Sequence, residues 1–179
     1  MRKTIALDMD EVVVDIYARF HSLYKTQYGA EPVVADYAGG KFYDLPGAAH
    51  FRDFLFEPGF FADLPIFPGA RDVIAWLYER YDVFIVTAAQ EFPHSLPDKY
   101  RWLQEHLPFI SWKRYVFCGD KSIVHTDYML DDHAYNLRNF RGTPLLFSAP
   151  HNLGMTAFTR LDNWEEVRTY FEKELAGGA

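Results

Sequence analysis

Cysteine is almost absent from this chain of 179 residues, since Cys118 is the only one. An intramolecular disulfide is therefore impossible, and nothing in the cysteine usage indicates an oxidising compartment. Long apolar runs are lacking too, and no segment approaches the length of a membrane-spanning helix. Because Asp8 interrupts the first apolar segment before a hydrophobic leader could form, we expect no signal peptide. We therefore expect a cytoplasmic protein that does not enter a membrane.

Positive charge is also scarce. The 18 Lys and Arg residues face 25 Asp and Glu residues, which gives a formal net charge of −7. Duplex nucleic acid is bound through a basic surface, so we expect no nucleic acid polymer as a partner. A small anionic substrate is compatible with this charge, because a metal ion and a few local cations can overrule the global sign. With 49% hydrophobic residues, the chain can build the core of one domain that carries an insertion.

Two carboxylates follow the first apolar segment and organise the rest of the chain. Residues 5–7 have the pattern of a short buried strand, and Asp8 and Asp10 stand at its C-terminal end. Open α/β sheets bind ligands at this end of their strands, and side chains at i and i+2 share a face. Two like charges so close require a cation or a shared proton. An Asp-rich turn without a function is the alternative, and this pair alone does not decide between the two.

Strand and helix patterns then alternate, which predicts a parallel sheet covered on both faces. The expected fold class is α/β, with a three-layer Rossmann-like parallel sheet. We expect strands near residues 5–7, 82–87, 115–118, 128–132 and 144–148, and helices over 16–29, 48–56, 68–81, 97–107 and 163–175.

The segment between the first strand and the helix that begins at Pro68 is too long for an ordinary loop, at roughly fifty residues. We assign residues 1–15 and 66–179 to an α/β core. Residues 16–65 are expected to form a small helical cap, inserted after the first strand and placed over the site.

Further polar groups fall at the ends of the later strands. Thr87 ends the second strand, Lys121 follows the third, and Asp131 and Asp132 end the fourth. The ends of parallel strands gather at one edge of a sheet, so these groups should meet the first pair of aspartates. Carboxylates, a hydroxyl and an ammonium suit phosphoryl transfer assisted by Mg²⁺. Taken singly, each has a structural explanation: a β-branched strand residue, an exposed turn lysine and a helix cap.

The order of these groups resembles the four motifs of the haloacid dehalogenase (HAD) superfamily, and residues 8–12, Asp-Met-Asp-Glu-Val, resemble its first motif. Within it, residues 57–64 followed by 66–70, then 99–103 and 162–164, resemble the 5'(3')-deoxyribonucleotidases, or cytosolic 5'-nucleotidases of type C. This likeness runs from Lys3 to about Phe171 and is weakest from 28 to 52. Three positions depart from the common pattern: Glu11 replaces a frequent Gly, Ala88 a frequent hydroxyl, and His133 a frequent basic residue.

The resemblance implies a Mg²⁺-dependent phosphomonoester hydrolase that dephosphorylates (deoxy)nucleoside monophosphates through an aspartyl-phosphate. Asp8 would be the nucleophile, and Asp10 the general acid and base. The implied Mg²⁺ ligands are Asp8, the backbone carbonyl of Asp10, and Asp132. Thr87, Lys99 and Lys121 would hold the phosphate, and Asp131 would support Lys121 or a metal-bound water.

Four aromatic residues are the candidate substrate pocket. Phe60 and Phe61 lie where the chain returns from cap to core, and we expect one to stack on the base while the other packs cap against core. Tyr17 and Phe20, on the first cap helix, are candidates for the opposite wall.

Two other functions stay open at this point. One is a phosphatase of the same fold acting on a sugar phosphate or another small ester. The other is a phosphate-binding regulatory module, against which the intact Asp8 and Asp10 pair argues, since binding alone needs no acid. The sequence leaves open the base preference, the choice between 5' and 3' phosphates and the oligomeric state, for which a homodimer is one option.

Overall fold

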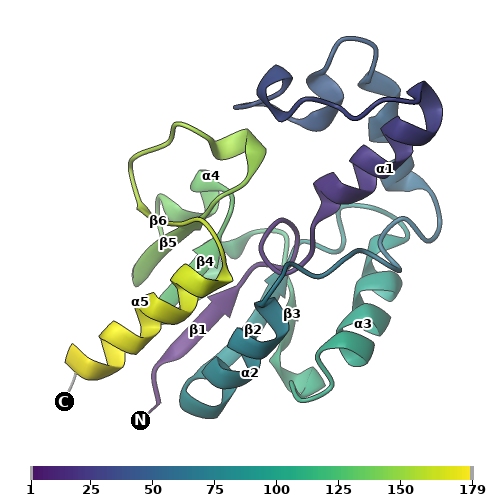
Figure 1. Ribbon diagram of the computed structural model, residues 1–179. Helices are drawn as coiled ribbons and strands as arrows, with labels where there is room; N and C mark the ends of the chain where they lie inside the picture. Colours follow the sequence, from purple (N-terminus) through teal and green to yellow (C-terminus); the bar gives the residue numbers. More distant parts are fainter. Residues whose placement is uncertain (1, 178–179) are drawn as a thin grey trace.

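A parallel sheet of six strands, in the order β3-β2-β1-β4-β5-β6, forms the centre of the computed structural model, which describes residues 2–177 (Figure 1). Its strands are β1 (Thr4–Leu7), β2 (Asp82–Thr87), β3 (Tyr115–Phe117), β4 (Tyr128–Asp131), β5 (Thr143–Phe147) and β6 (Thr159–Leu161). All five strand pairings are parallel. The α/β Rossmann-like class expected from the sequence is therefore confirmed. The strand order reverses between β1 and β4, and the crevice at such a point is where doubly wound sheets bind ligands.

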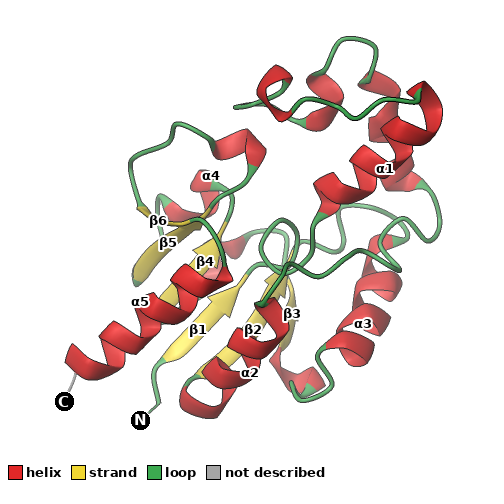
Figure 2. Ribbon diagram, viewed as in Figure 1, coloured by secondary structure: helices red, strands yellow, loops and turns green. Residues whose placement is uncertain are grey.

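Five α-helices accompany the sheet (Figure 2): α1 (Ile16–Tyr28), α2 (Ala70–Arg80), α3 (Ser95–His106), α4 (Ala134–Leu137) and α5 (Trp164–Gly177). On one face of the sheet, Ile5 and Leu7 join a large core with apolar residues of α2, α3 and α5. On the other face, Ala6 belongs to a smaller cluster that includes Leu137 of α4. This division follows from the two-residue period of a strand, which turns alternate side chains to opposite faces.

The remaining helical segments are short 3₁₀ helices, namely η1 (Val34–Asp36), η2 (Phe42–Asp44), η3 (Ala49–Phe56), η4 (Trp112–Arg114), η5 (Lys121–Ile123) and η6 (Pro150–Asn152). The expected helix over 48–56 is present, but as the 3₁₀ helix η3. The five expected strands are all present, and no end differs from its expected position by more than one residue. Helix α3 begins two residues before its expected start. Among the described residues, no helix is both long and apolar enough to cross a membrane.

The sixth strand and helix α4 were not expected from the sequence. β6 has three residues and lies at the sheet edge, and only Leu161 of the three is buried. α4 is a single turn of four residues. Both are too short for an apolar period to develop, so their positions are set by the tertiary structure around them.

The segment 16–65 leaves the core and returns to it at one point. Asp15 N–H donates to the Pro65 carbonyl at 2.9 Å, and Phe67 N–H donates to the Val13 carbonyl at 3.0 Å. Away from this neck, Phe20 stacks on Phe42 with ring centroids 5.1 Å apart. Figure 1 places α1 and the segment that follows it beyond the C-terminal ends of β1 and β2. These contacts support the division that we propose, a core of 1–15 and 66–179 with a cap of 16–65.

Candidate active site

The strand pairing brings the first and last aspartates of the motifs together. Leu7 of β1 is paired with Leu130 of β4, and Asp8 N–H donates to the Leu130 carbonyl at 2.9 Å. Asp8 and Asp131 therefore occupy neighbouring positions at the edge where the strand order reverses. Both carboxylates are buried, with 9% and 0% of the residue exposed. The sheet thus holds two acidic groups away from bulk water at its ligand-binding edge.

A buried ammonium bridges these two carboxylates. Lys121 Nζ lies 2.8 Å from Asp8 Oδ1 and donates to Asp131 Oδ2 at 2.7 Å. Burial opposes its charge, but Asp8 and Asp131 together raise the pKa of Lys121 well above its ordinary value. Asn136 Nδ2 also donates to both oxygens of Asp131 at 3.0 Å. Asp131 thus fixes the position of the Lys121 ammonium beside Asp8, and its role in the reaction stays a prediction.

Three carboxylates nonetheless share one ammonium, which leaves an excess of buried negative charge. Oxygens of Asp8, Asp131 and Asp132 lie within 4.8 Å of one another. Burial raises the pKa of Asp8 well above its ordinary value, and Asp131 and Asp132 add to the rise while Lys121 opposes it. In the absence of a further cation these surroundings favour the protonated form of Asp8. A hard divalent cation with oxygen ligands fits this donor set and would restore the ionised form.

The second aspartate of the first motif has its own lysine. Lys99 Nζ of α3 donates to Asp10 Oδ2 at 2.5 Å and to Thr87 Oγ1 at 3.2 Å. Lys99 is only 1% exposed, whereas the Asp10 side chain is 29% exposed. Asp10 Oδ1 has no hydrogen-bond partner among the described residues. Lys99 thus fixes one oxygen of Asp10, and the other oxygen is buried without a partner among the described residues.

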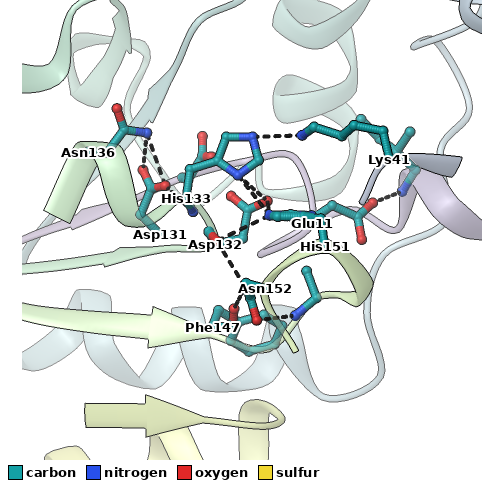
Figure 3. A network of polar contacts seen from close by, with 12 residues as sticks. Glu11, Lys41, Asp131, Asp132, His133, Asn136, Phe147, His151 and Asn152 are labelled. Carbon is teal, nitrogen blue, oxygen red and sulfur yellow. Dashed lines mark hydrogen bonds and ion pairs between the residues drawn. The ribbon is translucent and has the colours of Figure 1, made fainter. Parts of the chain in front are cut away.

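Two histidines and a cap lysine surround Asp132 (Figure 3). Asp132 Oδ2 lies 3.2 Å from His151 Nε2 and 3.4 Å from His133 Nδ1. Burial would raise the pKa of Asp132, but the His151 contact and the charges of His133, His151 and Lys121 lower this pKa to about 2. Lys41 Nζ, from the cap, lies 2.9 Å from His133 Nε2. Cap and core therefore meet at the carboxylate expected to bind metal.

The cap and the sheet edge enclose a cleft of about 300 Å³. Asp10, Asp132 and His133 lie at its core side, and the cap contributes mainly aromatic side chains. A second cavity of about 80 Å³ shares Asp10 and Asp132 with the cleft and is also lined by Asp8 and Lys121. A small polar cavity thus lies beside a larger and partly aromatic one. This layout matches a ligand that has one compact charged group and one flat ring.

The structure places the predicted pocket residues unequally. Tyr17, Phe20 and Phe61 line the larger cleft, and Phe61 stacks against Phe92 with centroids 5.7 Å apart. Phe60 is absent from this lining and packs against Phe20 at 5.4 Å and Phe61 at 4.9 Å. The roles of these residues in catalysis and binding stay predictions.

Several lining residues were not identified from the sequence: Lys41, Phe42, Tyr43, Glu91, Phe92, Tyr135 and His151. They come from the cap, from the β2–α3 connection, from α4 and from η6 after β5. No shared motif or spacing marks them, so only the folded chain could bring them together.

Sequence comparison gives close relatives over nearly the whole chain. The family model described as "5' nucleotidase, deoxy (Pyrimidine), cytosolic type C protein" matches residues 2–174. A provisionally named 5'(3')-deoxyribonucleotidase of Staphylococcus aureus is 39% identical over 172 residues, which cover 95% of this chain and 96% of the relative. The 5'(3')-deoxyribonucleotidase of Bacillus subtilis is 34% identical over 170 residues, covering 93% and 97%.

Solved structures with the same fold are more distant in sequence. A haloacid dehalogenase-like protein from Agrobacterium tumefaciens has a TM-score of 0.58 at 14% identity and covers 98% of this chain and 100% of its own. A provisionally named HAD hydrolase from Bacillus subtilis, solved bound to magnesium, has a TM-score of 0.55 at 14% identity and covers 96% and 99%. These structures confirm the HAD fold.

Proposed function

Because this chain belongs to the cytosolic type C family of 5'-nucleotidases, we propose that it removes the phosphate from (deoxy)nucleoside monophosphates with the help of Mg²⁺. The observation that carries the proposal is the pair of adjacent cavities, with Asp8, Asp10 and Lys121 lining the small one and cap aromatics around the large one. The phosphate would enter the small cavity, and the nucleoside would fill the large one. The cytosolic description of the family supports a cytoplasmic location as well.

Asp8 is the proposed nucleophile. Its carboxylate would attack phosphorus to give an aspartyl-phosphate, while the bond to the nucleoside oxygen breaks. Lys121, 2.8 Å from Asp8 and held by Asp131, would pair with a phosphoryl oxygen beside that carboxylate. Thr87 is linked through Lys99 to Asp10, so its hydroxyl would define the other side of the phosphate.

Asp10 is the proposed acid and base. Its side chain lines both cavities, between the phosphate chamber and the nucleoside cleft. From there it would protonate the departing nucleoside oxygen and then take a proton from the water that attacks the aspartyl-phosphate. Lys99 orients this carboxyl by holding Oδ2.

The proposed metal site consists of Asp8, the Asp10 carbonyl and Asp132. Bound there, Mg²⁺ supplies the positive charge that keeps Asp8 ionised and offsets the phosphoryl oxygens. The solved HAD hydrolase bound to magnesium supports this choice of ion. The low pKa of Asp132 supports it too, because an ionised carboxylate is available without any prior loss of a proton.

The test is a panel of deoxynucleoside and ribonucleoside monophosphates, as 5' and 3' isomers, beside ribose and hexose phosphates. Phosphate release should be fastest for nucleotides in Mg²⁺ and should vanish in EDTA. If a sugar phosphate outcompetes every nucleotide, the substrate assignment is wrong. Equal turnover in EDTA and Mg²⁺ would exclude the metal.

A further inference from the structure

Glu11 has an unusual backbone conformation next to the proposed acid. Its φ of 57° is the only positive value of a non-glycine residue in the part of the chain described here. An L side chain in this left-handed region is strained by contact between Cβ and the backbone, and glycine avoids that cost. Strain of this kind persists where the surrounding structure holds it and where it serves a function. The question is therefore what the Glu11 side chain does.

The Glu11 carboxylate reaches forward along the chain to the first cap helix. Oε1 accepts hydrogen bonds from the backbone N–H groups of Ile16 at 2.7 Å and Tyr17 at 3.1 Å. The first amides of an α-helix have no intrahelical acceptor, and the helix dipole favours an acidic group there. The usual cap is also present, since Asp15 Oδ1 accepts from Ala18 N–H at 2.7 Å. Glu11 is thus a second hydrogen-bond acceptor for the first amides of α1. It belongs to the loop after β1 that carries Asp8 and Asp10, here called the catalytic loop.

This contact fixes where the cap helix stands over the site. Glu11 is 6% exposed, so its side chain has little room to reorient. Its backbone is held as well, because Glu11 N–H donates to the Val14 carbonyl at 2.8 Å. Tyr17 donates its backbone N–H to Glu11, and its side chain lines the cleft. The Tyr17 ring stacks on Tyr37, and its hydroxyl lies 3.3 Å from His151 Nδ1. The direction of α1 therefore sets the position of the cleft wall.

We infer that Glu11 is a positioning residue that ties the cap helix α1 to the catalytic loop and so places the Tyr17 wall for the nucleoside. This inference rests on the proposed nucleotidase function. It accounts for a strained glutamate where glycine would be easier to accommodate. A glycine could supply the same backbone turn but could not accept the two helix amides.

The test compares Glu11→Gly, Glu11→Ala and Glu11→Gln. The Gly variant removes both the carboxylate and the backbone strain, whereas the Ala variant removes the carboxylate and keeps the strain. The Gln variant keeps a carbonyl oxygen that can accept hydrogen bonds from both amides. In Glu11→Gly, the KM for a nucleotide should rise by about tenfold or more, and kcat/KM for p-nitrophenyl phosphate should fall several times less. Glu11→Gln should restore most of the nucleotide activity. Glu11→Ala should melt at a lower temperature than Glu11→Gly.

Hydrogen exchange tests the contact without any substrate. The amides of Ile16 and Tyr17 should exchange about tenfold faster or more in Glu11→Gly than in wild type, with protection regained in Glu11→Gln. Absence of nucleotide turnover in wild type would refute the proposed function. The exchange rates would still test whether Glu11 holds the Ile16 and Tyr17 amides. The matched control is Asp15→Ala, which removes the ordinary cap of the same helix. It should lower the melting temperature and leave the ratio of nucleotide to p-nitrophenyl phosphate activity unchanged.

Three results would overturn the inference. In the first, Glu11→Gly loses nucleotide activity while exchange at Ile16 and Tyr17 is unchanged, which would make Glu11 a direct substrate contact. In the second, exchange rises but both substrates lose activity equally, so that the wall position is irrelevant. In the third, Asp15→Ala lowers the substrate ratio as much as Glu11→Gly, which would reduce the effect to helix capping alone.

Discussion

Lys99 Nζ lies 2.5 Å from Asp10 Oδ2 and joins α3 to the loop that follows β1. The same ammonium donates to Thr87 Oγ1, so one buried cation links two strand ends and a helix. The sequence resemblance implied a phosphate contact for Lys99. The observed contacts instead support a role in which Lys99 orients Asp10, the proposed acid. Direct contact between Lys99 and phosphate stays a prediction.

Replacing Lys99 with Met tests this orientation. The change leaves one oxygen of Asp10 without its charged partner in a largely buried position, which costs about 1–3 kcal/mol of unfolding free energy. Nucleotide kcat should fall by about tenfold or more, because the acid is no longer held in place. Urea unfolding and steady-state kinetics measure the two effects. The control is Lys173→Met, at an exposed position of α5, which should change neither the unfolding free energy nor kcat. Wild-type stability and kcat in Lys99→Met would refute the orienting role.

The sequence predicted the sheet and the acidic edge well because both follow local rules. Continuous apolar runs cover Ile5 to Leu7, Val83 to Val86 and Tyr128 to Leu130. Asp8, Thr87 and Asp131 stand where these three runs end. Parallel pairing then forces these ends together, whatever the rest of the chain does. The His133, His151 and Lys41 contacts could not be predicted in this way. They join three loops far apart in sequence, and their geometry depends on how the cap sits on the core.

Asp10→Asn should affect substrates according to their leaving groups. A nucleoside alkoxide must be protonated as it departs, whereas nitrophenolate leaves with little help. We expect the loss of kcat for a nucleotide to exceed the loss for p-nitrophenyl phosphate by about tenfold or more. Single-turnover measurements at saturating substrate give the comparison directly. Equal losses would assign Asp10 a structural role in place of the acid.

The raised pKa of Asp8 predicts a pH-dependent stability in EDTA. In the window between the ordinary pKa, about 4, and the raised one, the folded state binds a proton that the unfolded state lacks. The contribution of Asp8 to stability is therefore complete below the ordinary value and is lost as the pH rises through the raised value. The Asp8→Asn variant lacks this pH-dependent contribution to stability. The difference in melting temperature, wild type minus variant, should therefore increase as the pH falls from about 8 to 5.

Subtracting the variant cancels the opposing effect of His133, whose pKa is lowered mainly by burial. Mg²⁺ should flatten the pH dependence of this difference, because a cation favours the ionised carboxylate. A difference that is constant with pH in EDTA would mean that Asp8 is already ionised without metal.

Phe61→Leu tests the aromatic wall. Phe61 lines the cleft, and loss of base stacking costs about 1–3 kcal/mol, so nucleotide kcat/KM should fall by about tenfold. Activity on p-nitrophenyl phosphate should be nearly preserved. Phe60→Leu is the matched control, because Phe60 packs beside Phe61 without lining the cleft. It should lower the melting temperature and reduce both activities alike. The reverse pattern would exchange the roles of the two rings.

Asp8→Asn gives the most direct test of the proposed chemistry, in which Asp8 removes the phosphate of a nucleotide as the nucleophile. Inorganic phosphate released from deoxynucleoside monophosphates in Mg²⁺ should be readily measured for wild type and lower by about a thousandfold or more for Asp8→Asn. Circular dichroism should be the same for both proteins, since an amide fits the same space. Turnover by Asp8→Asn within tenfold of wild type, or no release from any nucleotide by wild type, would contradict the account.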